Sequence, residues 1–119
     1  MDNEFSLALR KIKEVDPKGL VEQVFQFFSL VNYMDEQTII AAYQTLILFR
    51  SGVSLEDRET LRRYSLIEKP MIDRMFTLVL KTSSDKRQAT ALSFKEVVRE
   101  AHHDRFNELL RITTPRPWP

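Results

Sequence analysis

Cysteine is absent from the 119 residues, and this absence excludes disulfide bonds, thiolate zinc sites and cysteine nucleophiles. A chain without cysteine fits a reducing compartment, so we expect a cytoplasmic protein. Long apolar runs are absent too, because no run approaches the roughly 18 residues of a membrane-spanning helix. Residues 1–10 carry acids where a signal peptide carries basic residues. We expect a protein that is neither inserted into a membrane nor secreted.

Glycine occurs only twice and proline five times, which is too little for a flexible, disordered chain. Hydrophobic residues make up 43% of the sequence, which is enough for a packed core. The length is that of one ordinary domain, since single domains usually have about 100 to 150 residues. We predict one helical domain over residues 1–114. Residues 115–119 form an extended, proline-rich tail, because proline cannot continue a helix.

Catalytic motifs are missing as well. The sequence contains no phosphate-binding loop, no dinucleotide fingerprint and no nucleophile elbow. The only histidines, His102 and His103, are neighbours whose side chains point about 100° apart on a helix, so they cannot share a metal as an i, i+4 pair can. We predict no enzyme, no metal site and no cofactor.

A strong net charge is also absent, because 18 basic residues face 17 acidic ones. This balance disfavours binding of polyanions by bulk electrostatics alone. The charges are nevertheless unevenly distributed. Residues 1–48 hold four Lys/Arg against seven Asp/Glu, whereas residues 49–119 hold fourteen against ten. We therefore expect any phosphate-binding surface in the second part of the chain.

Apolar residues recur at spacings of three and four along most of the sequence, which predicts helices. Asp35 caps one of them, Gly52 closes it in the left-handed conformation, and Pro70 occupies the first turn of another. Two capping pairs mark further helix starts, Ser54 with Asp57 and Ser93 with Glu96. The predicted helices cover residues 5–12, 20–31, 35–50, 55–64, 70–80 and about 18 residues from Ser93 onward.

These helices predict an all-α fold, a compact helical domain of five to six helices. An alternative adds one small β-hairpin at residues 78–92, because residues 77–80 also suit a strand. Seven of the twelve aromatic residues lie within the first 49, more than a monomer of this size needs for its core. We interpret this excess as a dimer interface. Its predicted contacts are Phe25, Phe28, Val31, Tyr43 and Phe49, and Trp118 offers a docking anchor in the tail.

Residues 54–80 have the spacing of a helix-turn-helix, with a short helix, a break and a second helix. Basic residues surround this segment, and guanidinium and ammonium groups suit DNA phosphates and guanine edges. The predicted DNA-binding residues are Arg62, Arg63, Lys69, Arg74, Lys81, Lys86 and Arg87. The alternative interpretation is an ordinary solvated face, because Glu59, Glu68 and Asp73 lie close enough to neutralise part of the charge.

One segment resembles the FlhD family of bacterial transcription activators. The matching residues are Leu48-Phe49-Arg50-Ser51-Gly52-Val53-Ser54-Leu55-Glu56, then Leu61, Ser65-Leu66, Leu78-Val79 and Asp85, without a gap over about a third of the chain. The resemblance implies a small helical dimer that joins an FlhC-like zinc-binding partner, binds promoter DNA and recruits RNA polymerase. It also implies that Phe49 and Arg50 hold a helix junction and a partner surface.

A second segment resembles MarR-like winged-helix regulators. The segment is Asp85-Lys86-Arg87-Gln88-Ala89-Thr90-Ala91-Leu92-Ser93, which is similar to the family's wing and the cap of its last helix. Both resemblances imply transcription. We therefore expect a DNA-binding transcription regulator, an activator subunit that acts as a dimer with a partner subunit at promoters. The alternatives are a MarR-like regulator and an adaptor or anti-activator that binds another regulator without touching DNA.

Overall fold

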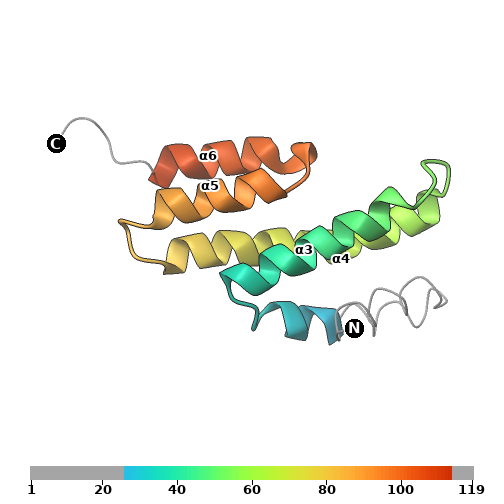
Figure 1. Ribbon diagram of the computed structural model, residues 1–119, viewed down its shortest axis with the longest axis horizontal. Helices are drawn as coiled ribbons and strands as arrows, with labels where there is room; N and C mark the ends of the chain where they lie inside the picture. Colours follow the sequence, from blue (N-terminus) through green and yellow to red (C-terminus); the bar gives the residue numbers. More distant parts are fainter. Residues whose placement is uncertain (1–25, 114–119) are drawn as a thin grey trace. The chain divides into compact units, whose positions relative to one another are not determined.

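The computed structural model describes residues 26–113, and every regular element in this range is a helix. Residues 26–31 are helical, and the following elements are α3 (Glu36–Ser51), α4 (Arg58–Lys81), α5 (Arg87–Val97), a 3₁₀ turn (Glu100–His102) and α6 (His103–Thr113) (Figure 1). The predicted all-α class is therefore confirmed for these residues. The predicted helix at residues 5–12 and the tail at residues 115–119 lie outside the described range.

The chain divides into two compact units inside α4, between Ile72 and Asp73. Unit 1 holds residues 26–31, α3 and the first part of α4, while unit 2 holds the rest of α4, α5 and α6. The sequence predicted a single domain over residues 1–114.

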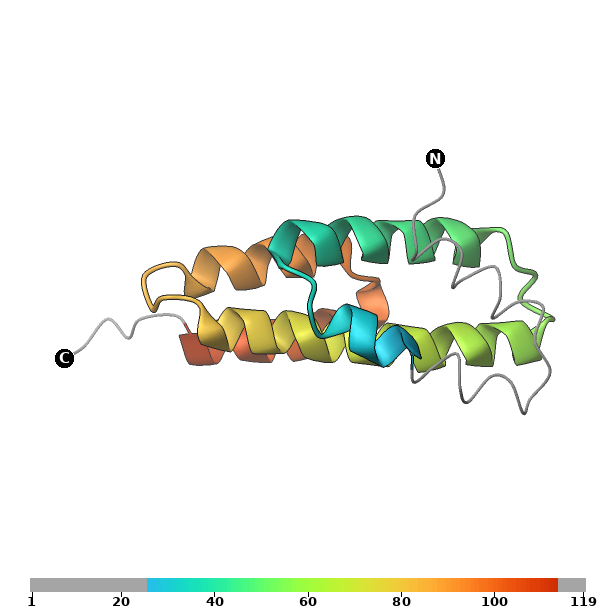
Figure 2. The ribbon, with the colours of Figure 1, turned by 90° about the horizontal axis from the view of Figure 1, so that it is seen from below.

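In unit 1, α3 begins where the sequence predicts. The Asp35 carboxylate accepts a hydrogen bond from the backbone N–H of Thr38 at 2.8 Å, so it caps the helix. Figure 2 shows α3 and the first part of α4 side by side. The buried apolar side chains of this unit include Phe27, Val31, Ile39, Leu46, Ile67 and Met71. Each such side chain stabilises the fold by about 1.5–3 kcal/mol relative to an exposed one.

The predicted helix-turn-helix is wrong, because α4 runs without a break from Arg58 to Lys81. The prediction rested on the preference of Pro70 for the first turn of a helix, whereas Pro70 lies inside α4. An internal proline removes one backbone hydrogen bond and costs about 3 kcal/mol. Side chains at helical spacing on both sides of Pro70 are buried, among them Tyr64, Ile67, Met71 and Met75. Their burial outweighs the cost of the proline, so the helix continues.

The junction between α3 and α4 differs from the prediction in two details. Gly52 has a φ of −86°, so it closes α3 in the right-handed region. Its N–H donates to the carbonyl of Phe49 at 3.2 Å, a tightened last turn that needs no left-handed residue. Asp57, rather than Ser54, caps α4 by accepting from the backbone N–H of Thr60 at 3.2 Å and from its hydroxyl at 2.7 Å. Helix α4 therefore begins at residue 58 instead of residue 55.

In unit 2, α5 and α6 lie side by side (Figure 1). The predicted cap at Ser93 is wrong, because Ser93 lies inside α5 and its hydroxyl donates to the carbonyl of Ala89 at 3.0 Å. Helix α5 ends at Val97 and the backbone of Val98 is extended, so one predicted long helix becomes two. The alternative β-hairpin at residues 78–92 is wrong as well. Residues 78–81 close α4, and residues 87–92 belong to α5, which also rules out a wing strand there.

Candidate nucleic-acid interface

The seven predicted DNA-binding residues lie in both units. Three of them, Arg62, Arg63 and Lys69, belong to unit 1, and four, Arg74, Lys81, Lys86 and Arg87, belong to unit 2. They do not surround a turn between two short helices, because that turn does not form. The two groups are therefore considered separately.

In unit 1, two of the three cations share one acid. Arg62 lies 3.3 Å and Arg63 3.5 Å from the Glu59 carboxylate. The Arg63 side chain is only 12% exposed, so it offers little surface to a polyanion. Lys69 is exposed. These contacts match the solvated-face interpretation, in which nearby acids neutralise part of the positive charge.

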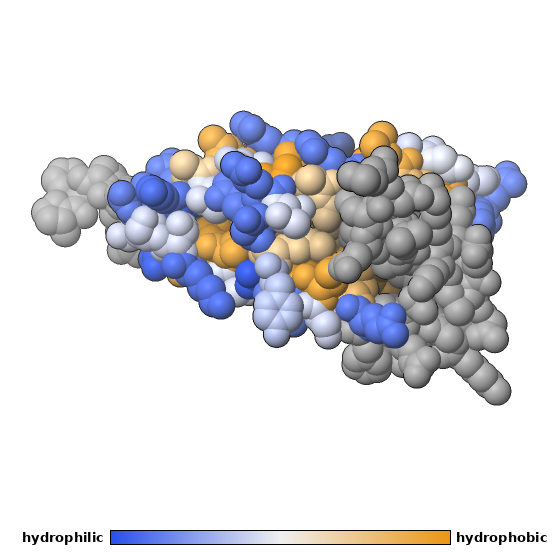
Figure 3. Space-filling model, turned by 60° about the horizontal axis from the view of Figure 1, so that its bottom comes forward, coloured by the Kyte–Doolittle hydropathy of each residue, from blue (hydrophilic) through white to orange (hydrophobic). Residues whose placement is uncertain are grey.

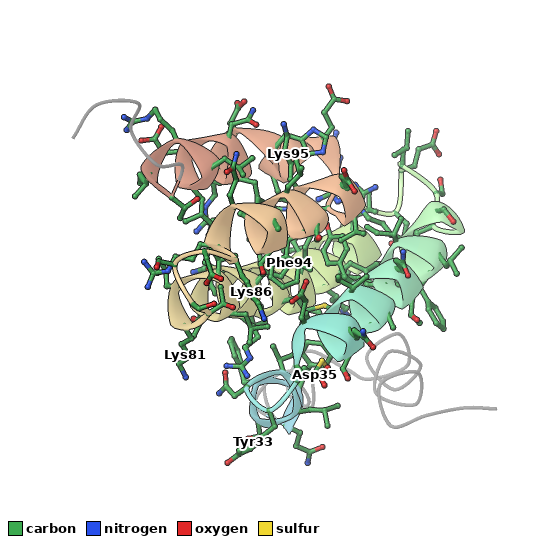
Figure 4. All side chains as sticks on the ribbon, turned by 60° about the vertical axis from the view of Figure 1, so that its left-hand side comes forward. Tyr33, Asp35, Lys81, Lys86, Phe94 and Lys95 are labelled. Atoms are coloured by element: carbon green, nitrogen blue, oxygen red, sulfur yellow. The ribbon has the colours of Figure 1, made fainter. Side chains whose placement is uncertain are left out.

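In unit 2, basic residues gather where α4 ends and α5 begins. We call residues 81–87 the basic turn, in which three cations stand against one acid, Asp85. Lys81 ends α4 and Lys86 precedes α5, and both are exposed. Neither lysine forms an ion pair within residues 26–113. Figure 4 shows both at the end of α4. Their charges are therefore available to a partner.

Arg74 extends this surface along α4. It lies seven residues before Lys81, so both residues share one face of the helix about 10 Å apart. Arg74 is half-buried. Among the predicted DNA-binding residues of unit 2, the exposed ones are thus Lys81 and Lys86 of the basic turn.

Arg87 has a different environment from the two lysines. Its Nε–H donates to the carbonyl of Thr82 and its Nη2–H to the carbonyl of Leu80, both at 3.3 Å. These carbonyls belong to the end of α4 and the residue after it. Sequence reasoning placed Arg87 on DNA, and it could not foresee this contact because the side chain reaches back from the next helix.

The residues predicted for a partner surface are also separated by the structure. Phe25 and Trp118 lie outside the described residues. Val31 and Tyr43 are fully buried, so they contribute to the core of the chain and not to a surface, which corrects the prediction. Phe28 is 38% exposed, and Phe49 and Arg50 are half-buried. Both residues lie in the last turn of α3.

The most exposed large apolar residues among the described part of unit 1 are not on the predicted list of interface contacts. Tyr33 is 89%, Leu48 73% and Leu55 80% exposed. Leu48 lies on α3 between the exposed Gln44 and Ser51, on the side opposite the buried residues. A leucine within an otherwise polar stripe was the available signal.

A buried polar pair was missed as well. The hydroxyl of Tyr43 donates to the Glu68 carboxylate at 2.6 Å, and Glu68 is only 4% exposed. Sequence reasoning counted Glu68 among surface acids, because residues 25 positions apart give no local sign of contact. A second tyrosine, Tyr64, is 2% exposed. Burial raises the pKa of its phenol, and the charge of Asp57 adds to the shift.

In unit 2, an aromatic pair joins α4 to α6. The rings of Phe76 and Phe106 stack with their centroids 4.7 Å apart. The Arg105 guanidinium lies 4.4 Å from the centroid of Phe76, and it also lies 3.7 Å from the Asp73 carboxylate. These contacts fix the last part of α4 against α6, and thereby place the basic turn.

The described residues offer no metal centre, because no three His, Cys, Asp or Glu side chains within residues 26–113 are grouped to hold an ion. His102 and His103 are half-buried, and Nε2 of His103 lies 3.3 Å from the carbonyl of Val98. Among these residues there is also no helix with both the length and the apolar character to cross a membrane.

Comparison of the chain with models of protein families, with curated proteins and with solved structures found no match.

Proposed function

We propose that the chain is a DNA-contacting subunit of a transcription regulator, in which the basic turn contacts the phosphate backbone. The observation that carries the proposal is the pair of exposed lysines without ion pairs, Lys81 and Lys86, on the connection between α4 and α5. Phosphate contacts position a protein on DNA without reading its sequence. The proposed subunit is cytoplasmic and acts as a homodimer.

A partner subunit supplies the sequence specificity in this proposal. Residues 58–81 form one continuous helix in place of a helix-turn-helix, and residues 87–92 are helical in place of a wing strand, so neither predicted element is there to read base edges. The FlhD resemblance favours an FlhC-like partner and recruitment of RNA polymerase, and it favours activation over repression. A chain with a net charge of +1 binds promoter DNA weakly by itself, since its affinity depends on a few phosphate contacts.

A mobility-shift assay tests the proposal. Promoter fragments from the gene's own neighbourhood are titrated at several salt concentrations, with the protein alone and with the product of the adjacent gene. We expect a specific shift only with the partner. The double variant Lys81→Ala/Lys86→Ala should reduce the slope of log K against log salt by about two units for each copy of the chain that contacts the DNA, one per lost contact.

The matched control is Arg58→Ala/Lys69→Ala, which removes two exposed cations from unit 1 instead. It should leave the slope unchanged. An unchanged slope for the Lys81/Lys86 variant, or an equal loss in the control, contradicts the assignment to the basic turn.

The second candidate function is an adaptor that binds another regulator through apolar contacts. It is favoured by the exposure of Leu48 and Leu55 in unit 1. Figure 3 shows apolar residues reaching the surface between hydrophilic ones on the face it presents. The absence of any DNA shift, together with a native regulator whose co-purification is abolished by Leu48→Ser/Leu55→Ser, supports the adaptor over the DNA-contacting subunit.

A further inference from the structure

We infer that Arg87 is a positioning residue of the basic turn, which holds Lys81 and Lys86 in place for phosphate and does not itself contact DNA. This inference rests on the proposed function. It departs from the sequence-based expectation, in which Arg87 was one more phosphate-binding cation. Direct contact with phosphate and positioning of the turn would both use the positive charge of Arg87. The geometry of the guanidinium therefore decides between these two roles.

The first argument is that the guanidinium is already engaged. Two of its N–H groups donate to the carbonyls of Leu80 and Thr82, on either side of Lys81. A helix leaves its last four carbonyls without partners inside the helix. Arg87 satisfies the carbonyl of Leu80, and the backbone N–H of Thr82 satisfies that of Leu78 at 3.1 Å. These two bonds use two of the five N–H groups of the guanidinium, and they hold it beside the end of α4.

The second argument comes from the helix dipoles. Arg87 is the first residue of α5, which has no acid in its first turn, and a cation at this end opposes the positive helix N-terminus. The guanidinium instead reaches the C-terminal end of α4, where a cation is favourable. One side chain therefore fastens the end of α4 to the start of α5.

The consequence concerns the two lysines. Lys81 lies between the two residues whose carbonyls Arg87 binds, and Lys86 directly precedes Arg87. The backbone N–H of Lys86 donates to the carbonyl of Ser83 at 2.9 Å, which closes the turn between the two lysines. With the guanidinium in place, both ammonium groups project from a fixed backbone, so less freedom is lost when they bind adjacent phosphates. Without it, the turn must be ordered by the DNA.

The test uses Arg87→Lys, which keeps the charge but cannot span two carbonyls with a planar fork, beside Arg87→Ala. Arg111→Lys is the matched control, because Arg111 is an exposed arginine at the end of α6 whose partner is Glu108. Two quantities are measured well below the melting temperature, with helix content verified by circular dichroism. They are hydrogen exchange of the Thr82 and Lys86 amides, and affinity and salt slope on promoter DNA with the partner subunit present.

If Arg87 positions the turn, Arg87→Lys and Arg87→Ala should both increase the hydrogen-exchange rates of the Thr82 and Lys86 amides about tenfold. Both should also weaken DNA binding about fivefold to tenfold. The salt slope of Arg87→Lys should equal that of the wild type. The control should change neither quantity. Wild-type binding by Arg87→Lys, together with a slope lower by one unit in Arg87→Ala, overturns the inference in favour of direct contact.

Unchanged amide exchange in both variants also overturns the positioning role, whatever the DNA result. A wild-type protein that shifts no DNA, with or without the partner, overturns the proposed function and the role of Arg87 in it. Accelerated exchange would then show only that the guanidinium holds the turn. The failure of the inference and the failure of the proposed function are thus distinguishable.

Discussion

Replacing Tyr43 with phenylalanine removes one hydroxyl from the core of unit 1 and leaves the ring in place. In the wild type this hydroxyl donates to the Glu68 carboxylate at 2.6 Å, and both side chains are buried. A hydrogen bond to a charged group contributes about 1.5–3 kcal/mol, and the variant removes this one donor from the buried carboxylate. We expect Tyr43→Phe to lower the free energy of unfolding by that amount.

Tyr64→Phe is the matched control, because it removes the same hydroxyl from a second buried tyrosine of unit 1. The Tyr64 hydroxyl has no hydrogen-bond partner in the described part of the chain. Deleting an unpaired buried hydroxyl removes a dehydrated polar group, so the change should be neutral or stabilising by up to about 1 kcal/mol. Urea unfolding followed by circular dichroism measures the free energy of unfolding of both variants. On heating, Tyr43→Phe should lower the melting temperature by about 6–12 °C.

The same control makes a prediction about pH. Because burial raises the pKa of Tyr64 in the folded state, the folded protein holds this proton more tightly than the unfolded chain. Stability is unaffected below the unfolded pKa of about 10 and falls as pH rises through the folded pKa. Tyr64→Phe should lose less stability above pH 10 than the wild type. Equal costs for the two tyrosine variants, or a cost below about 0.5 kcal/mol for Tyr43→Phe, would refute the reasoning.

Three further predictions address other contacts. Asp35→Ala should lower the melting temperature at neutral pH. The hydroxyl and backbone N–H of Thr38 hold the pKa of Asp35 below its usual 3.8. The Asp35 carboxylate therefore stabilises the fold above about pH 3.8, and this stabilisation disappears as pH falls through the folded pKa. At that low pH the melting temperatures of variant and wild type should converge. Arg105→Ala should cost about 0.5–1 kcal/mol in urea unfolding, because the guanidinium lies over Phe76, and Arg105→Lys should recover part of that loss. Phe106→Ala should cost about 3–5 kcal/mol in the same assay, because the ring is fully buried; a cost below about 1 kcal/mol contradicts its place in the core.

The elements that sequence reasoning predicted correctly are those whose signals are local. Helix α3 begins beside Asp35 because a carboxylate at this position accepts from an N–H three residues later, which one short segment determines. It ends near Gly52, although without the left-handed conformation. Helix α4 ends at Lys81, one residue from the predicted end at residue 80. Each of these features requires knowledge of only a few neighbouring residues.

The wrong predictions applied local rules where long-range packing decides. Pro70 and Ser93 are both typical of helix starts, yet both lie inside helices. The burial of Ile67 and Met71 on one side of α4 exceeds what an internal proline costs. The bond from Tyr43 to Glu68 is likewise a contact between residues distant in sequence, so neither partner reveals it alone.

The charge of the basic turn bears on how the proposed regulator reaches its affinity. Two phosphate contacts give a salt slope of about −1.8, so raising salt from 50 to 200 mM weakens binding only about tenfold. A regulator with six to ten contacts loses about 10³- to 10⁵-fold over the same range. If Lys81 and Lys86 are the contacts of this chain, then its salt dependence alone is shallow and that of the complex is steep. The difference between the salt slope of the complex and that of this chain alone gives the number of phosphate contacts that a second copy and the partner subunit contribute. This number separates a subunit that shares DNA binding from an adaptor that only holds a DNA-binding protein.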